Sequence, residues 1–323
     1  MHPLLAPTPR DVVCTDAGAS LIRFRSATPT APQGRPVLLV PSMINRWYVL
    51  DLRAGASLAG ALVAQGLDVW LLDWGAPRDE DRYLEWDDVV RRLSRMARRV
   101  RRETGHEKLS LMGYCMGATV AGIYAALEPE GVGAFANLLG PFDFSQAGYL
   151  GLVADKRWFD ADAVADAGNV APQQMQGGFV MLRPTAQLAK LVGVLDRGMD
   201  DGFKALEAWA NDNIAFPAAA YRRYIKELYQ ENQLVKGEHR VAGRAVNLAN
   251  ITCPVLTIAA ARDTICPKEA ALGLNRAVKN AELLEVPGGH VGAVVGGAAS
   301  RVLYPALAKF FSPSALPVRS AAS

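Results

Sequence analysis

Cysteine, net charge and long apolar runs are all scarce in this sequence of 323 residues. Its four cysteines include no Cys-x-x-Cys pair, so we expect neither a disulfide framework nor a metal site. The 35 basic and 32 acidic side chains leave a net charge of +3, which argues against nucleic-acid binding. No run of 18 apolar residues predicts a membrane span. The N-terminus lacks the pattern of a secretory signal, and we expect a cytoplasmic protein.

The sequence does contain the composition and the alternation of a packed α/β domain. Half of its residues are hydrophobic and 21% are charged. Short apolar runs, which start near residues 35, 70, 110, 135, 253 and 281, alternate with segments of helical period. Because parallel strands need a long return connection, this alternation predicts a mostly parallel, twisted sheet flanked by helices.

The alternation stops between residues 145 and 240, where tryptophan, tyrosine, glutamine and arginine are interspersed with helical stretches. We interpret residues 145–240 as a cap, or lid, inserted into the core. Residues 1–144 then form the first half of the core, and residues 241–312 form its second half. Residues 313–323 have the composition of a loose tail.

A cysteine between two glycines follows the third apolar run. Residues 113–117 read Gly-Tyr-Cys-Met-Gly, a nucleophile elbow in which sulfur replaces the usual serine oxygen. The glycines remove side chains that would collide with neighbouring backbone at the sharp strand-to-helix turn. Cys115 would stand at a helix N-terminus, where the helix dipole favours a thiolate. The amide of Met116 would point into an oxyanion hole.

An acid and a histidine follow the cysteine in the order used by α/β-hydrolases. Asp263 comes after one predicted strand, and His290 follows the next strand and a Pro-Gly-Gly turn. Loops at the carboxyl ends of strands form the site in such sheets. The sequence therefore predicts an α/β-hydrolase fold with a triad of Cys115, His290 and Asp263. No equivalent position is held by the remaining histidines, which are His2, His106 and His239.

Each of these residues also has a simpler interpretation. Cys115 can be a buried cysteine in a glycine-rich turn, because free cysteines are among the most buried residue types. Asp263 can cap the helix that starts near Pro267, and both of its roles can hold together. A lone histidine in a loop is usually a surface residue. Cys266 has no elbow of its own, so we interpret it as a packing residue. The charge run Arg91–Glu103 is interpreted as the solvated face of a helix.

Several separated motifs resemble those of the polyhydroxyalkanoate synthases. They are the elbow GYCMGAT, PSMINRWYVLDL from Pro41, DWG at residues 73–75, PGGHVGAVVGG from Pro287, and the long stretch from WANDN to AARD. The resemblance extends from about Pro36 to Gly297. It implies transfer of acyl groups from (R)-3-hydroxyacyl-coenzyme A to a growing polyester. Coenzyme A is released as a product, and no other cofactor is expected.

The resemblance also implies roles for the triad residues. Cys115 would be the nucleophile and the acyl carrier, and His290 would be its base. Asp263 would orient His290 or help to activate the incoming 3-hydroxyl group.

Backbone roles follow from the same resemblance. The second oxyanion amide, beside that of Met116, would come from the PSMIN turn, at Met43 or Ile44. Asp212, in the WANDN motif, matches a position that we interpret as structural.

Two residues and the chain length depart from the pattern of the family. Ala118 stands where a glycine is common, and Thr264 stands where a histidine is common. The long N-terminal domain of the single-subunit synthases is missing, so the sequence resembles the short forms that work with a separate subunit. We therefore expect a homo- or hetero-oligomer, which can lie at the surface of a polyester granule.

Two other functions stay open at this point. A thioesterase or a polyester depolymerase would use the same triad but would pass the acyl group to water. A non-catalytic, granule-associated subunit would keep only the fold.

Overall fold

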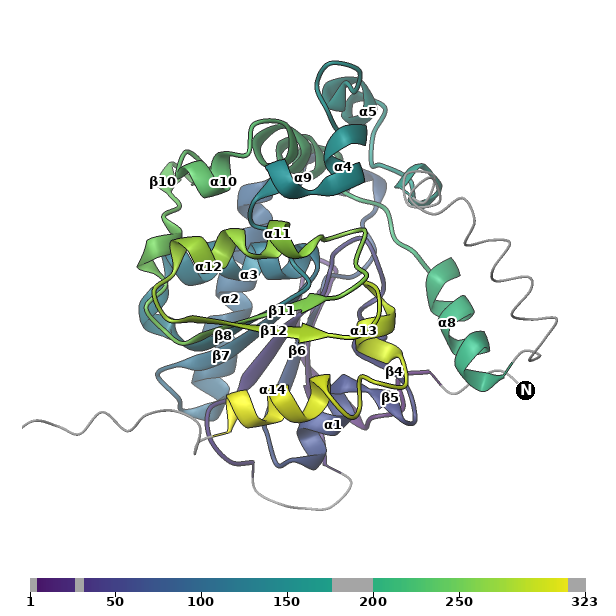
Figure 1. The fold of residues 1–323 in the computed structure, drawn as a ribbon, viewed down its shortest axis with the longest axis vertical. Helices are drawn as coiled ribbons and strands as arrows, with labels where there is room; N and C mark the ends of the chain where they lie inside the picture. The colour runs from purple at the N-terminus through teal and green to yellow at the C-terminus, as the bar shows by residue number, and fades with distance from the viewer. Residues whose placement is uncertain (1–4, 27–31, 176–199, 313–323) are drawn as a thin grey trace, which may run out of the picture.

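The computed structural model describes residues 5–26, 32–175 and 200–312. Eight strands form one sheet in the order β1-β2-β6-β3-β7-β8-β11-β12 (Figure 1). Neighbouring strands from β6 to β12 are parallel, which confirms the predicted α/β architecture. The strands are β1 (Arg10–Asp16), β2 (Ala19–Phe24), β3 (Val37–Val40), β6 (Val69–Asp73), β7 (Leu109–Tyr114), β8 (Val132–Leu138), β11 (Val255–Ala260) and β12 (Ala281–Val286).

The antiparallel pair β1–β2 lies outside the prediction. It is a hairpin at the edge of the sheet, and β2 also pairs antiparallel with β6. Its tight turn places Ala17 and Gly18 at positive φ. Most of β1 is exposed, so its sequence has no continuous apolar run to signal a strand.

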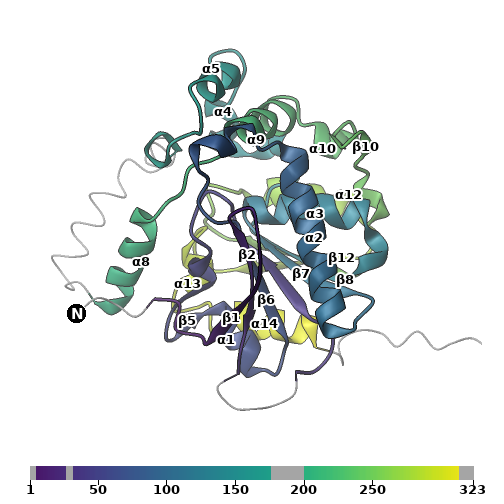
Figure 2. The same cartoon turned by 180° about the vertical axis from the view of Figure 1, so that it is seen from behind.

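Two layers of helices cover the two faces of the sheet (Figures 1 and 2). On β3, Leu38 and Val40 join the core layer that contains side chains of α2 and α3. Val37 and Leu39 join the opposite layer, with α1 and α14. Strands buried on both faces in this way read as unbroken apolar runs. The helices of the core are α1 (Leu58–Ala64), α2 (Trp86–Thr104), α3 (Met116–Leu127), α11 (Lys268–Ala271), α12 (Gly273–Ala277), α13 (Gly292–Val295) and α14 (Leu303–Phe311).

The long charged helix α2 corrects one detail of the sequence interpretation. Most arginines of the run Arg91–Glu103 do face solvent, but Arg92 is only 7% exposed. Its guanidinium donates to the carbonyl of Ala17 at 3.3 Å, which ties α2 to the edge hairpin. Burial lowers the pKa of Arg92. Its long aliphatic stem can pack against apolar neighbours, so a charged residue can occupy an inner position.

The segment between β8 and β11 is largely helical where the structure describes it. We call residues 145–240 the lid; the domain boundaries stay a prediction, and residues 176–199 lie outside the described part, as does the predicted tail. The described residues also contain two short hairpins, β4 (Asp51–Arg53) with β5 (Ala56–Ser57), and β9 (Arg240–Val241) with β10 (Arg244–Ala245). The helices in the described part of the lid include α4 (Gly148–Val153), α5 (Ala161–Asp166), α8 (Asp201–Asn211), α9 (Ala218–Arg223), the π-helix η5 (Tyr224–Gln230) and α10 (Gln233–Lys236).

A buried polar network fastens the lid to α2. The indole N–H of Trp86 donates to Nε2 of His239 at 3.1 Å, and Nδ1 of His239 lies 3.0 Å from the carboxylate of Glu227 in η5. Arg223 bridges the same carboxylate and Asp87 on α2. Because His239 accepts from Trp86 and lies next to Glu227, this fully buried histidine is a link between helices.

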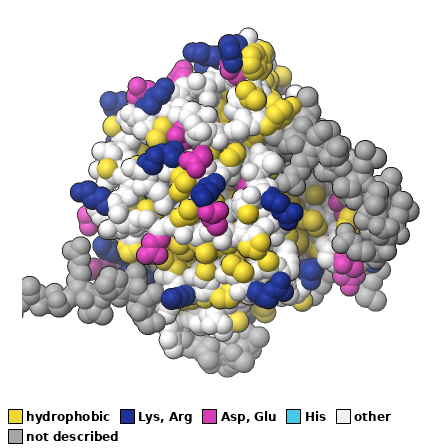
Figure 3. All heavy atoms as spheres, in the orientation of Figure 1, with side chains coloured by type: hydrophobic (Ala, Val, Ile, Leu, Met, Phe, Trp, Pro, Cys, Tyr) yellow, Lys and Arg dark blue, Asp and Glu magenta, His cyan; other side chains and the backbone are white. Residues whose placement is uncertain are grey.

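The outer surface of the lid is partly apolar. Apolar side chains gather over α4 and α5 in Figure 3, where Tyr149, Leu152 and Trp158 are exposed. Elsewhere on this face, charges of both signs are interspersed. No helix in residues 5–26, 32–175 or 200–312 is long and apolar enough to cross a membrane.

Candidate active site

Cys115 occupies a strained turn between β7 and α3. Its backbone has φ +56° and ψ −130°, a conformation that residues other than glycine rarely adopt. The amide of Cys115 donates to the carbonyl of Leu138 on the neighbouring strand at 2.9 Å. Its carbonyl accepts from the amide of Ala118 at 2.9 Å and so begins the helix. This strand–turn–helix context is the one that the elbow motif requires.

Both glycines of the elbow stand where a side chain would meet backbone atoms. A Cβ at Gly113 would lie 2.2 Å from the Cα of Ala118, and a Cβ at Gly117 would lie 2.1 Å from the carbonyl oxygen of Val40. The contact at Gly117 also presses α3 against Pro41, the first residue of the PSMIN turn. The glycines therefore bring the elbow and this turn into direct backbone contact.

His290 and Asp263 meet at the carboxyl edge of the sheet. Nδ1–H of His290 donates to Oδ2 of Asp263 at 2.7 Å. The other carboxylate oxygen of Asp263 accepts from the amides of Ile265 and Cys266 at 2.8 and 2.9 Å. Asp263 thus caps a local turn as well as holding His290, while α11 itself begins after Pro267.

The imidazole of His290 is enclosed and electrostatically coupled to the cysteine. It is 7% exposed and stacks on the ring of Tyr114, with centroids 5.4 Å apart. Burial would lower the pKa of His290, but the negative charge of Cys115 and the bond to Asp263 outweigh it and raise the pKa to about 10. With Nδ1 held by Asp263, Nε2 is the nitrogen available to Cys115. The site therefore favours the protonated form of the His290 imidazole.

The PSMIN turn lies beside the cysteine, and this turn is held by a β-bridge to the residues that follow α8. Met43 and Ile44 are both buried, and Ile44 lines both cavities described below. Asn45 forms an isolated antiparallel bridge with Asn213, and their side-chain amides bond at 2.5 Å. The amide of Ile214 also donates to the carbonyl of Ile44 at 3.4 Å. The end of α8 is thereby attached to the turn that carries Met43 and Ile44, the two alternatives for the second oxyanion amide.

Asp212 strengthens the same attachment. Its carboxylate accepts from the guanidinium of Arg46 at 3.0 Å and from the hydroxyl of Tyr48 at 2.8 Å. The indole of Trp209 donates to the carbonyl of Arg46 at 2.9 Å. Burial and the bond to Asp212 raise the pKa of Tyr48, so the phenol stays a donor. These contacts agree with a structural role for Asp212.

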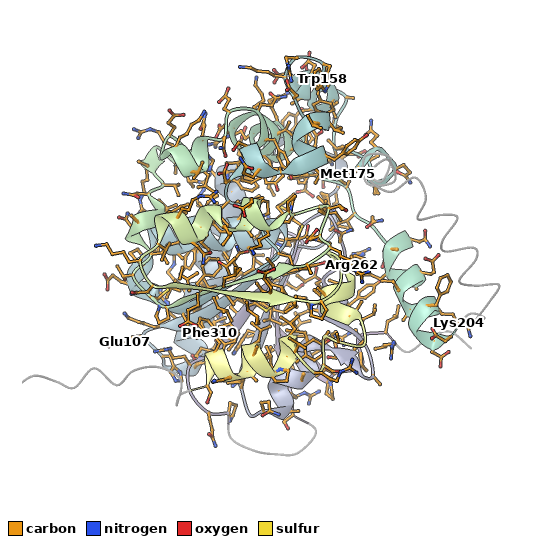
Figure 4. All side chains as sticks on the ribbon, viewed as in Figure 1. Glu107, Trp158, Met175, Lys204, Arg262 and Phe310 are labelled. Carbon is orange, nitrogen blue, oxygen red and sulfur yellow. The ribbon has the colours of Figure 1, made fainter. Side chains whose placement is uncertain are left out.

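Two cavities meet at Cys115. The triad cavity, of about 200 Å³, is lined by His290, Asn45 and Trp209 as well as by Cys115. The lid cavity, of about 170 Å³, runs from Cys115 and Met116 toward α4, α9 and η5. Figure 4 shows Met175, which lines both cavities, beside the helical layer, and Arg262 below it at the sheet edge. An acyl group on the sulfur would therefore have space on two sides.

Three other positions singled out from the sequence have clear environments. Cys266 is 2% exposed, and burial raises the pKa of its thiol well above the usual value, which agrees with a packing role. The side chain of Ala118 is fully buried, and its Cβ fills the space where a Cβ at Gly140 would lie, 2.3 Å away. Thr264 is exposed.

The sequence did not predict two contacts that support the site, the stacking of Tyr114 on His290 and the link between Asn45 and Asn213. Tyr114 is the first of the two variable residues of Gly-x-Cys-x-Gly, and nothing in the motif indicates that its ring supports the histidine. The link between Asn45 and Asn213 joins residues 168 positions apart. No group of three or more potential metal ligands occurs within the described residues.

Comparisons with known proteins add a family to this geometry. The model of the alpha/beta hydrolase fold family matches residues 35–296, and the model of the poly-beta-hydroxybutyrate polymerase (PhaC) N-terminus matches residues 3–61. A poly(3-hydroxyalkanoate) polymerase subunit PhaC from Synechocystis is 33% identical over 94% of this chain and 84% of the relative. This chain belongs to the PhaC family.

Other members of the PhaC family give the same picture. The subunit from Allochromatium vinosum is 32% identical over 90% of this chain and 85% of the relative. The subunit from Haloferax mediterranei is 32% identical over 94% of this chain, but the match spans only 64% of that longer protein. The predicted resemblance to the synthases and to their short forms is confirmed.

Solved structures confirm the fold. A hydrolase from Pseudomonas aeruginosa has a TM-score of 0.59 at 15% identity, covering 93% of this chain and 97% of the other. An alpha/beta hydrolase fold protein from Chitinophaga pinensis has a TM-score of 0.53 at 13% identity, covering 95% and 98%. At this identity the likeness concerns the architecture alone.

Proposed function

We propose that this PhaC chain is the polymerising subunit of a poly(3-hydroxyalkanoate) polymerase with Cys115 as nucleophile. The observation that carries the proposal is the 2.7 Å bond between His290 and Asp263, at a sheet edge where His290 and Cys115 line one cavity. The order of the three residues along the chain is that of α/β-hydrolase triads. The names of the relatives supply the reaction class.

The first half-reaction loads the acyl group onto the enzyme. The thiolate of Cys115 attacks the thioester carbonyl of (R)-3-hydroxyacyl-coenzyme A, and a new carbon–sulfur bond forms. The bond to coenzyme A breaks, and the departing thiolate takes the proton of the His290 imidazolium. The amides of Met116 and of Met43 or Ile44 stabilise the oxyanion. Exchange between two thioesters is nearly balanced in energy.

The second half-reaction forms the ester. Neutral His290, oriented by Asp263, removes the proton of a 3-hydroxyl group, and the oxygen attacks the acyl group on Cys115. The carbon–sulfur bond breaks, and the thiolate beside an imidazolium is restored. Water competes with the hydroxyl for the same carbonyl, so an apolar lid favours polymer over free acid.

The subunit names of the short relatives also support a partner and a place of action. We propose that a second subunit assists the chain, and that the insoluble product keeps the assembly at the surface of a polyester granule. An assay of polymer formation with and without the partner subunit of a short-form relative tests the first point. A rate that does not change on its addition would contradict it.

The test of the function uses 3-hydroxybutyryl-coenzyme A and measures three products: coenzyme A, insoluble polymer and free acid. The native chain should release coenzyme A and form polymer, and Cys115→Ser should form almost none, because a serine hydroxyl is a much weaker nucleophile than a thiolate. Free acid without polymer would instead identify a thioesterase. Unchanged polymer yield in the variant would contradict the role of Cys115.

A further inference from the structure

The lid cavity combines an apolar wall with a few polar atoms near the nucleophile. Phe159, Phe216 and Ile225 contribute to its apolar lining. The lining side chains that carry polar atoms or thiols are Cys115, Gln174, Tyr221, Tyr224, Tyr229 and Cys266. A cavity meant for hydrocarbon alone would not need buried hydroxyl groups, because burying an unpaired polar group costs free energy.

Two of these tyrosines are brought together by an unusual piece of backbone. Tyr224 and Tyr229 are five residues apart in η5, whose end shows the i→i+5 pattern, since the amide of Glu231 donates to the carbonyl of Lys226 at 3.0 Å. In an α-helix such residues would point about 140° apart. In a π-helix they become neighbours, and here their ring centroids are 5.5 Å apart.

The two rings, which we call the tyrosine pair, are held firmly. Phe144 packs edge-on against both of them, with centroids 4.8 Å from Tyr229 and 5.9 Å from Tyr224. Trp86 lies 5.3 Å from Tyr224 on another side, and Phe216 lies 5.9 Å from it. Rings fixed by packing on several sides place their hydroxyl groups with little freedom.

Tyr224 is buried and Tyr229 is partly buried, and the hydroxyl groups of the tyrosine pair are bonded to each other. Tyr224 is 5% exposed, and its side chain hydrogen-bonds that of Tyr229. Burial and the negative charge of Cys115 raise the pKa of Tyr229, so its phenol stays protonated within electrostatic reach of the sulfur. Two phenols carry two O–H hydrogens, and the bond between them uses one. The second hydrogen can be donated to an acceptor in the cavity.

We infer that the tyrosine pair donates a hydrogen bond to the 3-oxygen of the acyl group carried by Cys115. This oxygen is a hydroxyl in a newly loaded unit and an ester oxygen once the chain has grown, and both accept hydrogen bonds. The lid cavity would then select acyl groups that carry oxygen at carbon 3 over plain fatty acyl groups of equal length. The inference rests on the proposed function and adds a specificity-determining pair to it.

The expected selectivity follows from the donor that a plain acyl chain would leave unpaired. A site built to bond a substrate oxygen discriminates against an analogue that lacks it, because the buried donor then has no partner. One neutral hydrogen bond of this kind corresponds to about a tenfold rate difference.

The test compares single-turnover acylation of the full chain by 3-hydroxybutyryl- and butyryl-coenzyme A, read as coenzyme A released and as mass added to the protein. The native chain should load the 3-hydroxy substrate about tenfold faster. Tyr229→Phe and Tyr224→Phe keep both rings but remove a hydroxyl, and each should lower this ratio toward one. The loss should fall on the 3-hydroxy substrate, while loading of butyryl groups stays the same or improves.

Tyr124→Phe is the matched control. Tyr124 is a buried tyrosine on α3 that does not line the lid cavity, and its hydroxyl has no partner among the described residues. This variant should keep the native ratio. Equal loading of both substrates by the native chain, or a native ratio in both variants of the tyrosine pair, would overturn the inference while leaving the proposed function intact. Loading of neither substrate by the native chain would overturn both.

Discussion

The carboxyl ends of the strands around Cys115 and the lid above them are held in place by different kinds of contact. At the sheet edge, strand ends and close backbone contacts at Gly113 and Gly117 set the positions. In the lid, the positions depend on side-chain networks, such as the link through His239. Backbone constraints of the first kind leave a local signature in the sequence. Side-chain networks between distant residues do not, and they are easier to loosen without unfolding the core.

The largest expected effect comes from filling the backbone contact of the elbow. Gly117→Ala would place a Cβ 2.1 Å from the carbonyl oxygen of Val40, so we expect a loss of about 3 kcal/mol of unfolding free energy and of nearly all activity. Gly151→Ala in α4 is the control from the lid, since a Cβ there meets nothing closer than 3.5 Å. Urea unfolding of both variants checks this. Equal stabilities would remove the contrast between the two regions.

The next effect concerns the network that fastens the lid. His239→Ala would leave the indole N–H of Trp86 and the carboxylate of Glu227 without their buried partner, at a cost of about 2 kcal/mol. His106→Ala, at an exposed histidine, should change stability by less than about 0.5 kcal/mol. Thermal unfolding of the two variants measures the difference. A His239 variant as stable as the native chain would show that the link through His239 does not help to hold the lid.

A smaller effect is expected at the attachment of α8. Asp212→Ala removes the carboxylate that accepts from Tyr48 and Arg46. Both bonds are only partly buried, so the loss of unfolding free energy should be about 1 kcal/mol. Because the attached turn carries the candidate oxyanion amides, kcat should fall more than the affinity for substrate. Asp166→Ala, which removes an exposed partner of Arg222, should leave kcat unchanged. A variant of Asp212 that raises only KM would contradict this account.

The last effect is one of pH. Burial opposes ionisation of Glu227, but hydrogen bonds from His239 and Arg223 outweigh it and lower the pKa of Glu227 from 4.5 to about 2. A lowered pKa stabilises the fold fully above pH 4.5, and this contribution is lost as the pH falls toward 2. Glu227→Gln should therefore be less stable than the native chain at pH 7, with the gap closing between pH 4.5 and 2. A gap that is constant across this range in thermal unfolding would argue against the ion pair.

The contrast explains how much the sequence could predict. The parallel strands could be predicted because each is a continuous apolar run. The elbow, Asp263 and His290 each follow the end of a strand, so local patterns also predicted that their side chains would meet. The exposed hairpin strand β1 lacked such a run. The support of His290 by Tyr114 and the bridge from Asn45 to Asn213 depend on tertiary packing, which no local spacing encodes.

The lid illustrates the same limit. Its helical stretches were recognisable, but the π-turn that pairs Tyr224 with Tyr229 was not, because a π-helix differs from an α-helix by one residue in its hydrogen bonding. Burial of Arg92 was also missed, since all arginines of the run Arg91–Glu103 were interpreted together as the solvated face of the helix.

The central claim, that Cys115 carries the acyl group, is tested most directly by locating the group after one turnover. The chain would be mixed with 3-hydroxybutyryl-coenzyme A, quenched in acid, digested and mapped by mass spectrometry. The account predicts the added mass on Cys115 alone, since burial raises the pKa of Cys253 to about 11 and also raises that of Cys266. An acyl group found on Cys266, or coenzyme A released with no acyl group on Cys115, would contradict it.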